Sequence, residues 1–415
     1  MQGGGVHAVN SVLVTHPQSE VMFSHNDADI GGALLCASTA KVVPAASSVL
    51  NGSALFLSNV AKTSGGAIYL QGLKGAEFVL ISDPRKISFE GNLAAEGAAI
   101  FSGYFVSIES RGMTFRRNIA SLKGGALYLS DTNLRLSFGH FRENSAHIAG
   151  GAVVAFDSTL VIIGTVFFYN SAQEDGGALA IYKKTAVELR NSSLKHNFLN
   201  GSAQAQNRYR CGGGALLCSD FSFALVSGGS VLEGNSAQPW DGGAILVRNQ
   251  AQVEVQASEI ALNMAEGLGG GAAATGSATL LFGAGVRIER NFAGKGGGAI
   301  FAGGLSVRMS SVTVRGNYAG EIGGGLLMYC PVEIDSHSQF FQNEAENGGA
   351  AFASGKSARL IVKPAGLVQF ESNAALNHGG GMYLEDSASY EVESEACPDS
   401  CSGSNRGNGI CDMAW

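Results

Sequence analysis

Hydrophobic residues along the chain occur in short runs that are separated by glycine, asparagine and serine. Typical runs are residues 160–163 and 278–282, which are rich in aliphatic and aromatic side chains and have the length of a short strand. Apolar positions do not recur at the three- and four-residue spacing of a helix, and the many pairs of adjacent glycines would weaken any helix. The pattern therefore predicts an all-β protein of many short strands joined by tight turns.

The strands belong to a sequence repeat that extends from end to end. Its first half reads Phe-x-x-Asn-x-Ala, as at residues 115–120, and its second half reads Gly-Gly-Ala-aliphatic-aromatic, as at residues 124–128. The repeat occurs thirteen times, most often at intervals of 26 residues, and Leu, Ile or Val replaces the Phe in five copies. The repeated asparagines are Asn26, Asn59, Asn92, Asn118, Asn144, Asn170, Asn197, Asn235, Asn263, Asn291, Asn317, Asn343 and Asn373.

A repeat of this length, made of strands and turns, fits one coil of a single-stranded parallel β-helix. Stacking of like units then buries the apolar face that no unit can bury alone. The fold-class prediction is an all-β solenoid of about thirteen coils. In this interpretation the Phe column fills the interior, the asparagines form a structural ladder of stacked amides at a bend, and the glycine pairs permit close approach of the backbone. Leucine-rich repeats and calcium-binding β-rolls do not fit, because their consensus residues are missing.

Composition and charge exclude several classes of protein. Charged residues make up 15% of the chain and hydrophobic residues 45%, which is the opposite of a disordered protein. No apolar run approaches the ~20 residues of a membrane-spanning helix, so we expect no membrane span within this segment. The formal net charge of −7 argues against nucleic acid as a partner.

The paired motifs resemble the polymorphic outer membrane protein repeat of the chlamydial autotransporter adhesins, over roughly residues 3–385. The resemblance implies a right-handed parallel β-helix of the pectin-lyase-like type, located outside the cell or at its surface and acting in adhesion. We therefore expect a non-catalytic adhesion or recognition segment of a larger modular protein. Its partner would be an unidentified cell-surface protein or glycan, and its β-helix would hold no cofactor.

Two alternatives stay open for the function. Many β-helix proteins cleave polysaccharides, so a lyase or hydrolase is the main alternative, and a structural spacer rod is the second. Enzymes that hydrolyse polysaccharides need carboxylates clustered on neighbouring coils. The aspartates here share no column, and we assign no catalytic residue.

An acidic row follows the asparagine bend and is interrupted by Lys62, Lys123 and Lys295. We interpret the row as a solvated edge, with a weak cation- or glycan-binding strip as the alternative. Its members are Asp29, Glu96, Glu174, Asp175, Asp241, Glu266, Glu321 and Glu346.

The longest interval between repeats contains an insertion at residues 200–210. Insertions in solenoids emerge as loops on one face and often carry binding functions. Arg208, Tyr209 and Arg210 supply two planar cations and an aromatic ring, which suit stacking on a sugar or a partner protein. We therefore name these three residues as a candidate binding site, and a plain excursion loop is the alternative.

The two ends of the chain differ from the repeats between them. The chain opens on the second half of a repeat, so we expect the β-helix domain, residues 1–392, to be truncated at its N-terminal end. Residues 393–415 form a second, Cys-rich segment with Cys397, Cys401 and Cys411. It resembles the start of a Notch-type LNR module, and an unrelated Cys-rich linker is the alternative. The resemblance implies disulfides to cysteines beyond Trp415, an oxidising compartment, and a Ca²⁺ site in the complete module with Asn408 as a ligand.

Overall fold

The computed structural model of the 415-residue chain describes residues 4–9, 14–15, 20–37, 48–50, 53–72, 76–80, 87–201, 211–363 and 367–392. These residues form strands, turns and bends, and no helix occurs among them. The chain divides into two compact units. Unit 1 comprises Met1–Ser202 with Ala215–Ala224, and unit 2 comprises Ala203–Gly214 with Leu225–Trp415.

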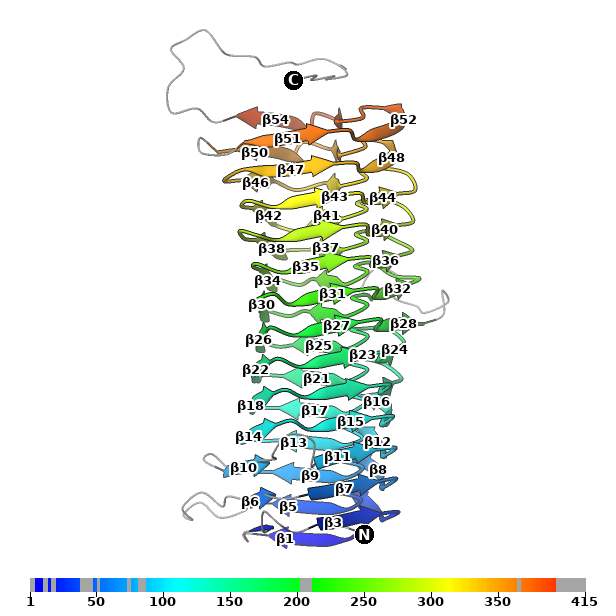
Figure 1. Ribbon diagram of the computed structural model, residues 1–415, viewed down its shortest axis with the longest axis vertical. Coiled ribbons are helices and arrows are strands. Elements are labelled where there is room, and N and C mark those ends of the chain that lie inside the picture. Colours follow the sequence, from blue (N-terminus) through cyan, green and yellow to red (C-terminus); the bar gives the residue numbers. More distant parts are fainter. Residues whose placement is uncertain are drawn as a thin grey trace. The chain divides into compact units, whose positions relative to one another are not determined.

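Each coil of the solenoid contains four short strands (Figure 1). In unit 1 a typical coil consists of β15 (Thr114–Arg116), β16 (Ile119–Lys123), β17 (Leu127–Ser130) and β18 (Thr132–Ser137). In unit 2 a typical coil consists of β39 (Arg287–Glu289), β40 (Phe292–Ala293), β41 (Ile300–Gly303) and β42 (Ser306–Met309).

Each strand pairs in parallel with the equivalent strand of the next coil, so the coils stack into parallel sheets. Two of these sheets in unit 1 carry the surfaces discussed below. The motif sheet contains the Phe of each repeat, in β3 (Glu20–Ser24), β7 (Ser53–Leu57), β11 (Ile87–Glu90), β15, β19 (His140–Arg142) and β23 (Val166–Phe168). In the next strand of this sheet, β27 (Ser193–Lys195), Leu194 takes the place of the Phe. The glycine sheet follows each Gly-Gly pair, or Gly97 and Ala98 in one coil, and includes β9 (Ile68–Gln71), β13 (Ile100–Gly103), β17, β21 (Val153–Phe156) and β25 (Leu179–Tyr182).

The predicted fold is confirmed for the described residues. They form a right-handed parallel β-helix of about thirteen coils, and the period of the sequence repeat is the period of the coil. Register follows the motif, since Phe115 lies opposite Phe141 and Leu127 lies opposite Val153 in the neighbouring coils. Like positions of the repeat therefore stack in columns.

The interior is built from those columns because side chains alternate between the two faces of each strand. In β18, for example, Leu134 and Leu136 are buried whereas Arg135 is exposed. The Phe column lies inside, and its rings stack nearly parallel with centroid separations of 4.5–5.0 Å from Phe23 to Phe167. The prediction that this column fills the core is confirmed.

The Gly-Gly pair occupies a point where two coils nearly touch. A Cβ atom added to Gly125 would lie 2.0 Å from the carbonyl oxygen of Gly151 in the next coil, closer than non-bonded atoms can approach. Gly124 has a φ of +68°, in the left-handed region that side chains disfavour. The pair therefore satisfies two separate backbone requirements, close approach and positive φ.

Candidate functional site

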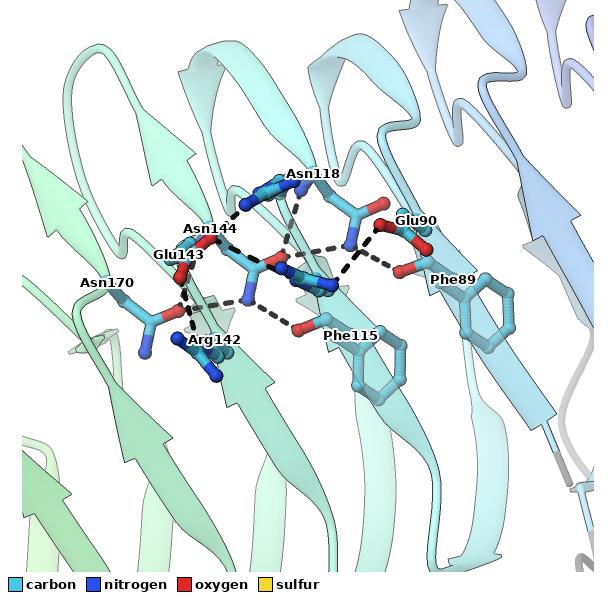
Figure 2. A network of polar contacts seen from close by, with 10 residues as sticks. Phe89, Glu90, Phe115, Asn118, Arg142, Glu143, Asn144 and Asn170 are labelled. Carbon is cyan, nitrogen blue, oxygen red and sulfur yellow. Dashed lines mark hydrogen bonds and ion pairs between the residues drawn. The ribbon is translucent and has the colours of Figure 1, made fainter. Parts of the chain in front are cut away.

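The repeated asparagines line the bend after the motif sheet, and Asn144 illustrates their bonding (Figure 2). Its Nδ2 donates to Oδ1 of Asn170 at 2.9 Å and to the carbonyl oxygen of Phe115 at 3.0 Å. Its Oδ1 accepts hydrogen bonds from both Nδ2 and the backbone N–H of Asn118. The side-chain amide thus uses both donors and both acceptor positions inside the protein. It has no bonding capacity left for a ligand, so its role is structural.

The structure brings the predicted asparagines together as one ladder within each unit. In unit 1 the amide-to-amide bonds connect Asn26, Asn59, Asn92, Asn118, Asn144, Asn170 and Asn197 in sequence. In unit 2 they connect Asn235, Asn263, Asn291, Asn317, Asn343 and Asn373.

The acidic row after the bend is not the uniformly solvated edge that the sequence suggested. Asp175 is buried, and its Oδ2 accepts a 2.8 Å hydrogen bond from the hydroxyl of Tyr182. Asp241 accepts a 2.7 Å hydrogen bond from the backbone N–H of Leu268, and its burial raises the pKa of its carboxyl group. The prediction is wrong for these two residues because their carboxylates accept hydrogen bonds from groups of the protein itself, which the repeat motif does not reveal.

The lysines that interrupt the row interact with its carboxylates one coil away. Lys62 Nζ lies 2.9 Å from Asp29 Oδ1, and Lys123 pairs in register with Glu96. Burial raises the pKa of Glu96, whereas the positive charge of Lys123 lowers it. The charges of Asp29 and Glu96 are therefore balanced locally by lysines of the neighbouring coil.

The outer face of the glycine sheet carries a column of aromatic rings, which we call the aromatic stack. It consists of half-buried Tyr69, Phe101, Tyr128, Phe156 and Tyr182. Successive ring centroids are 4.9, 4.9, 5.5 and 5.1 Å apart. The rings cover one another's faces, so a ligand would meet their edges and the phenol hydroxyls.

Charged groups surround the stack. The ammonium groups of Lys123 and Lys183 lie 5.3 and 5.6 Å from the ring centre of Phe156, within cation–π range. Burial, the carboxylate of Glu96 and the nearby phenol of Tyr104 together raise the pKa of Tyr128 to about 12. The phenol of Tyr128 is therefore a hydrogen-bond donor at neutral pH, beside groups of both charges.

Tyr104 and Phe105, which we call the aromatic pair, form the turn after β13. Both residues have left-handed backbone conformations, with φ values of 63° and 59°. Their side chains are 57% and 56% exposed. The pair directly follows β13, which holds Phe101 of the aromatic stack. Burial, followed by the Tyr104 phenol, raises the pKa of Tyr69 in the same stack. The stack and the pair together form the candidate binding surface.

Sequence reasoning missed this surface although signals for it were present. The fifth position of the glycine motif is aromatic in Tyr69, Phe101 and Tyr128, but the motif alone assigned no role to it. The doublet of Tyr104 and Phe105 occurs at a turn where another coil has Asn249 and Gln250, also with positive φ. Bulky aromatic residues in a position that suits asparagine are the signal that could have identified the pair.

Several residues predicted to bind ligands lie outside the described residues. These are Arg208, Tyr209 and Arg210 of the insertion, Asn408, and the cysteines Cys397, Cys401 and Cys411. The insertion site, the calcium site and the disulfides of the LNR-like segment stay predictions, as does the domain boundary at residue 392.

The described residues contain neither a metal-binding cluster nor a membrane-spanning helix. No group of three or more His, Cys, Asp and Glu side chains in these ranges has an arrangement that could hold a metal ion. The same residues contain no helix that is long and hydrophobic enough to cross a membrane.

Comparison with known proteins gives one family match. A model described as the Chlamydia polymorphic membrane protein (Chlamydia_PMP) repeat matches residues 53–71, which contain Phe56, Asn59 and the glycine pair at Gly65. The resemblance of the repeat to this family is thereby confirmed. No curated protein and no solved structure matches the chain.

Proposed function

We propose that this chain, which carries a repeat of the Chlamydia polymorphic membrane protein type, is a surface-exposed β-helix that acts in adhesion or recognition without catalysis. The repeat match supports a surface protein. The aromatic pair, which is exposed and held at positive φ, supports a binding role and is the observation that carries the proposal. The partner would be a protein or glycan of another cell.

The aromatic pair carries the proposal because folding alone does not favour it. A residue with a Cβ costs about 1–2 kcal/mol in the left-handed conformation, which Asn, Asp or Gly would largely avoid. Both residues are more than half exposed, so their rings gain less from packing than rings in the core do. Unfavourable backbone conformations retained at an exposed site are typical of binding surfaces, where a partner covers the side chains.

The carboxyl groups support a non-catalytic role. Hydrolysis of a glycosidic bond requires two carboxyl groups across the scissile bond, one of them with a raised pKa. Burial raises the pKa of Glu96 and of Asp241, but the charged side chain that acts on each is a lysine, Lys123 or Lys295. Neither residue thus forms the carboxylate pair of a glycosidase.

The proposal is tested by measuring attachment of the purified chain to cultured cells. Replacement of the pair, Tyr104→Asn with Phe105→Gly, should reduce attachment at least tenfold and leave the fold intact by circular dichroism. The matched control is Phe221→Gly, since Phe221 is 64% exposed at a φ of 63° but follows Asp220 instead of a second aromatic residue. Equal attachment by the two variants would contradict the role of the pair.

A further variant and an activity assay address the remaining possibilities. Tyr209→Ala tests the predicted insertion site, and we expect it to weaken attachment as well. A panel of polysaccharides assayed for reducing ends and unsaturated products should show no cleavage, with or without calcium. Turnover that a single carboxylate substitution abolishes would establish the enzyme instead, and absence of both attachment and turnover would favour the spacer.

A further inference from the structure

A second exposed site lies at the outer corner of the motif sheet, where it turns into the asparagine bend. We call this site the arginine corner and define it as Arg116, Arg117, Arg142, Glu143 and Tyr169. The side chains of Arg142 and Glu143 project outward from the same strands and bends that hold the asparagine ladder (Figure 2). Residues Arg117, Glu143 and Tyr169 occupy the same repeat position in three successive coils, all with positive φ.

Glu143 organises the three guanidinium groups. Its carboxylate accepts hydrogen bonds from Nε of Arg117 at 2.7 Å and Nε of Arg142 at 2.8 Å, and Nε of Arg116 lies 4.0 Å away. The hydrogen bond from Arg117, followed by that from Arg142, lowers the pKa of Glu143 against the effect of burial. The carboxylate therefore stays ionised and orients the arginines at neutral pH.

The arginines keep most of their hydrogen-bonding capacity. Within the guanidinium groups of these three described arginines, only Nε of Arg117 and Nε of Arg142 donate hydrogen bonds. Nε of Arg116 has no hydrogen-bond partner, and its Nη1 lies 3.7 Å from a carboxylate oxygen of Glu90. The terminal N–H groups of three planar forks thus remain available to an anion. Three cations against two carboxylates leave a positive excess in a chain whose net charge is −7.

Aromatic rings continue the corner into the next two coils. The guanidinium carbon of Arg142 lies 5.7 Å from the ring centre of Phe168. Tyr169 is 47% exposed, and its ring stacks on that of His196 at 5.3 Å. A ligand bound by the arginines would therefore meet an amphipathic aromatic surface beside its anionic groups.

We propose that the arginine corner binds a sulfated glycan. Guanidinium forks bind planar or tetrahedral oxyanions through paired hydrogen bonds, and the adjacent rings can pack against the apolar face of a sugar. A short sulfated segment of a glycan fits better than a nucleic acid, because the positive excess is confined to three arginines and the rest of the chain, with a net charge of −7, offers no extended basic surface to a long polyanion. The inference rests on the proposed surface function and names a ligand class for a second site outside the aromatic stack.

The experiment uses the full chain and a heparin octasaccharide as the probe, with affinity measured by calorimetry. The double variant Arg116→Gln with Arg142→Gln should bind at least tenfold more weakly than the unmodified chain. The control Arg287→Gln removes an exposed arginine of unit 2 that pairs with Glu259 at 2.6 Å, and it should change the affinity less than twofold. Binding should weaken as salt is raised, because the contacts are between exposed charges.

A second variant keeps the test decisive if the double variant does not fold. Arg142→Lys retains the charge but loses the planar fork, and it should still weaken binding at least threefold. Unchanged affinity in these variants, equal binding of desulfated heparin, or tighter binding of a DNA duplex or of phosphatidylserine vesicles would overturn the inference. If the variants lose heparin binding but still attach to cells, the proposed adhesion function stands. If the chain binds heparin but does not attach to cells, only the adhesion function is overturned.

Discussion

The side-chain amide of Asn144 donates a 2.9 Å hydrogen bond to Oδ1 of Asn170 in the next coil, and both side chains are fully buried. The same Oδ1 accepts the backbone N–H of Asn144 at 3.1 Å. This N–H lies in the bend between two sheets, where no strand partner is available to it. Because buried backbone groups must be paired, the ladder replaces at the bend the bonds that the sheets supply elsewhere.

We predict that Asn144→Ala lowers the free energy of unfolding by about 1–3 kcal/mol, because it leaves the donors of Asn118 and the carbonyl of Phe115 without partners. The control Asn133→Ala changes an exposed residue on β18 and should cost less than about 0.5 kcal/mol. Urea titrations measure both values. Equal losses in the two variants would show that the ladder contributes nothing beyond ordinary surface contacts.

A comparison of two glycines separates the cost of close approach from the cost of positive φ. Gly124 and Gly229 have φ values of +68° and +79°, so Ala at either position incurs about 1–2 kcal/mol for the left-handed conformation. A Cβ at Gly124 would also lie 2.3 Å from the carbonyl of Leu127, whereas one at Gly229 meets nothing within 4 Å. Gly124→Ala should therefore destabilise by at least about 1 kcal/mol more than Gly229→Ala, as judged by urea unfolding. Similar losses would show that the contact with the Leu127 carbonyl, within the same turn, adds nothing to the cost of positive φ.

Asp241→Asn should stabilise the protein at pH 7. Burial raises the pKa of Asp241 above the unfolded value of about 3.9, so the folded state holds the proton more tightly than the unfolded chain. The contribution of this group is then fully present below the unfolded pKa and is lost as pH rises through the folded pKa. Asn retains the oxygen that accepts the Leu268 N–H and carries no charge to bury.

Thermal melts of both proteins between pH 3 and pH 8 measure the effect of Asp241→Asn. The difference in melting temperature should be small near pH 3 and should grow in favour of the variant as pH rises. Asp157→Asn, at an exposed turn, should change stability by less than about 0.5 kcal/mol throughout. A variant less stable than the parent at pH 7 would indicate that attraction to Lys295 outweighs burial.

Replacement of the aromatic pair should affect binding and stability in opposite directions. Tyr104→Asn with Phe105→Gly relieves two left-handed residues, so the free energy of unfolding should rise by about 1 kcal/mol while cell attachment falls. Urea titration of the variant used in the attachment assay gives the value. A large loss of stability would assign the pair to packing instead of recognition.

The repeat was sufficient to predict the β-helix, the inward Phe column and the asparagine ladder. These features depend only on residues that recur at the same position of every coil, and stacking of coils brings such residues into contact whatever the rest of the sequence contains. Phe115, for example, meets Phe141 because both lie three residues before a ladder asparagine. Periodicity carries this information without an account of side-chain packing.

The outer surface was decided by the tertiary structure, because its contacts join different positions of the repeat. Tyr128 lies opposite Val154 in the sheet, yet its ring meets that of Phe156, two residues further along the next strand, at 5.5 Å. The aromatic stack therefore changes column between coils, and a search for recurring positions does not find it. Burial of Asp241 likewise depends on the path of the chain around the bend, which the repeat motif leaves unspecified. The sequence by itself determined which residues stack on one another from coil to coil. Only the three-dimensional packing decided which side chains from different repeat positions meet outside the core, because those contacts depend on the local shape of each turn.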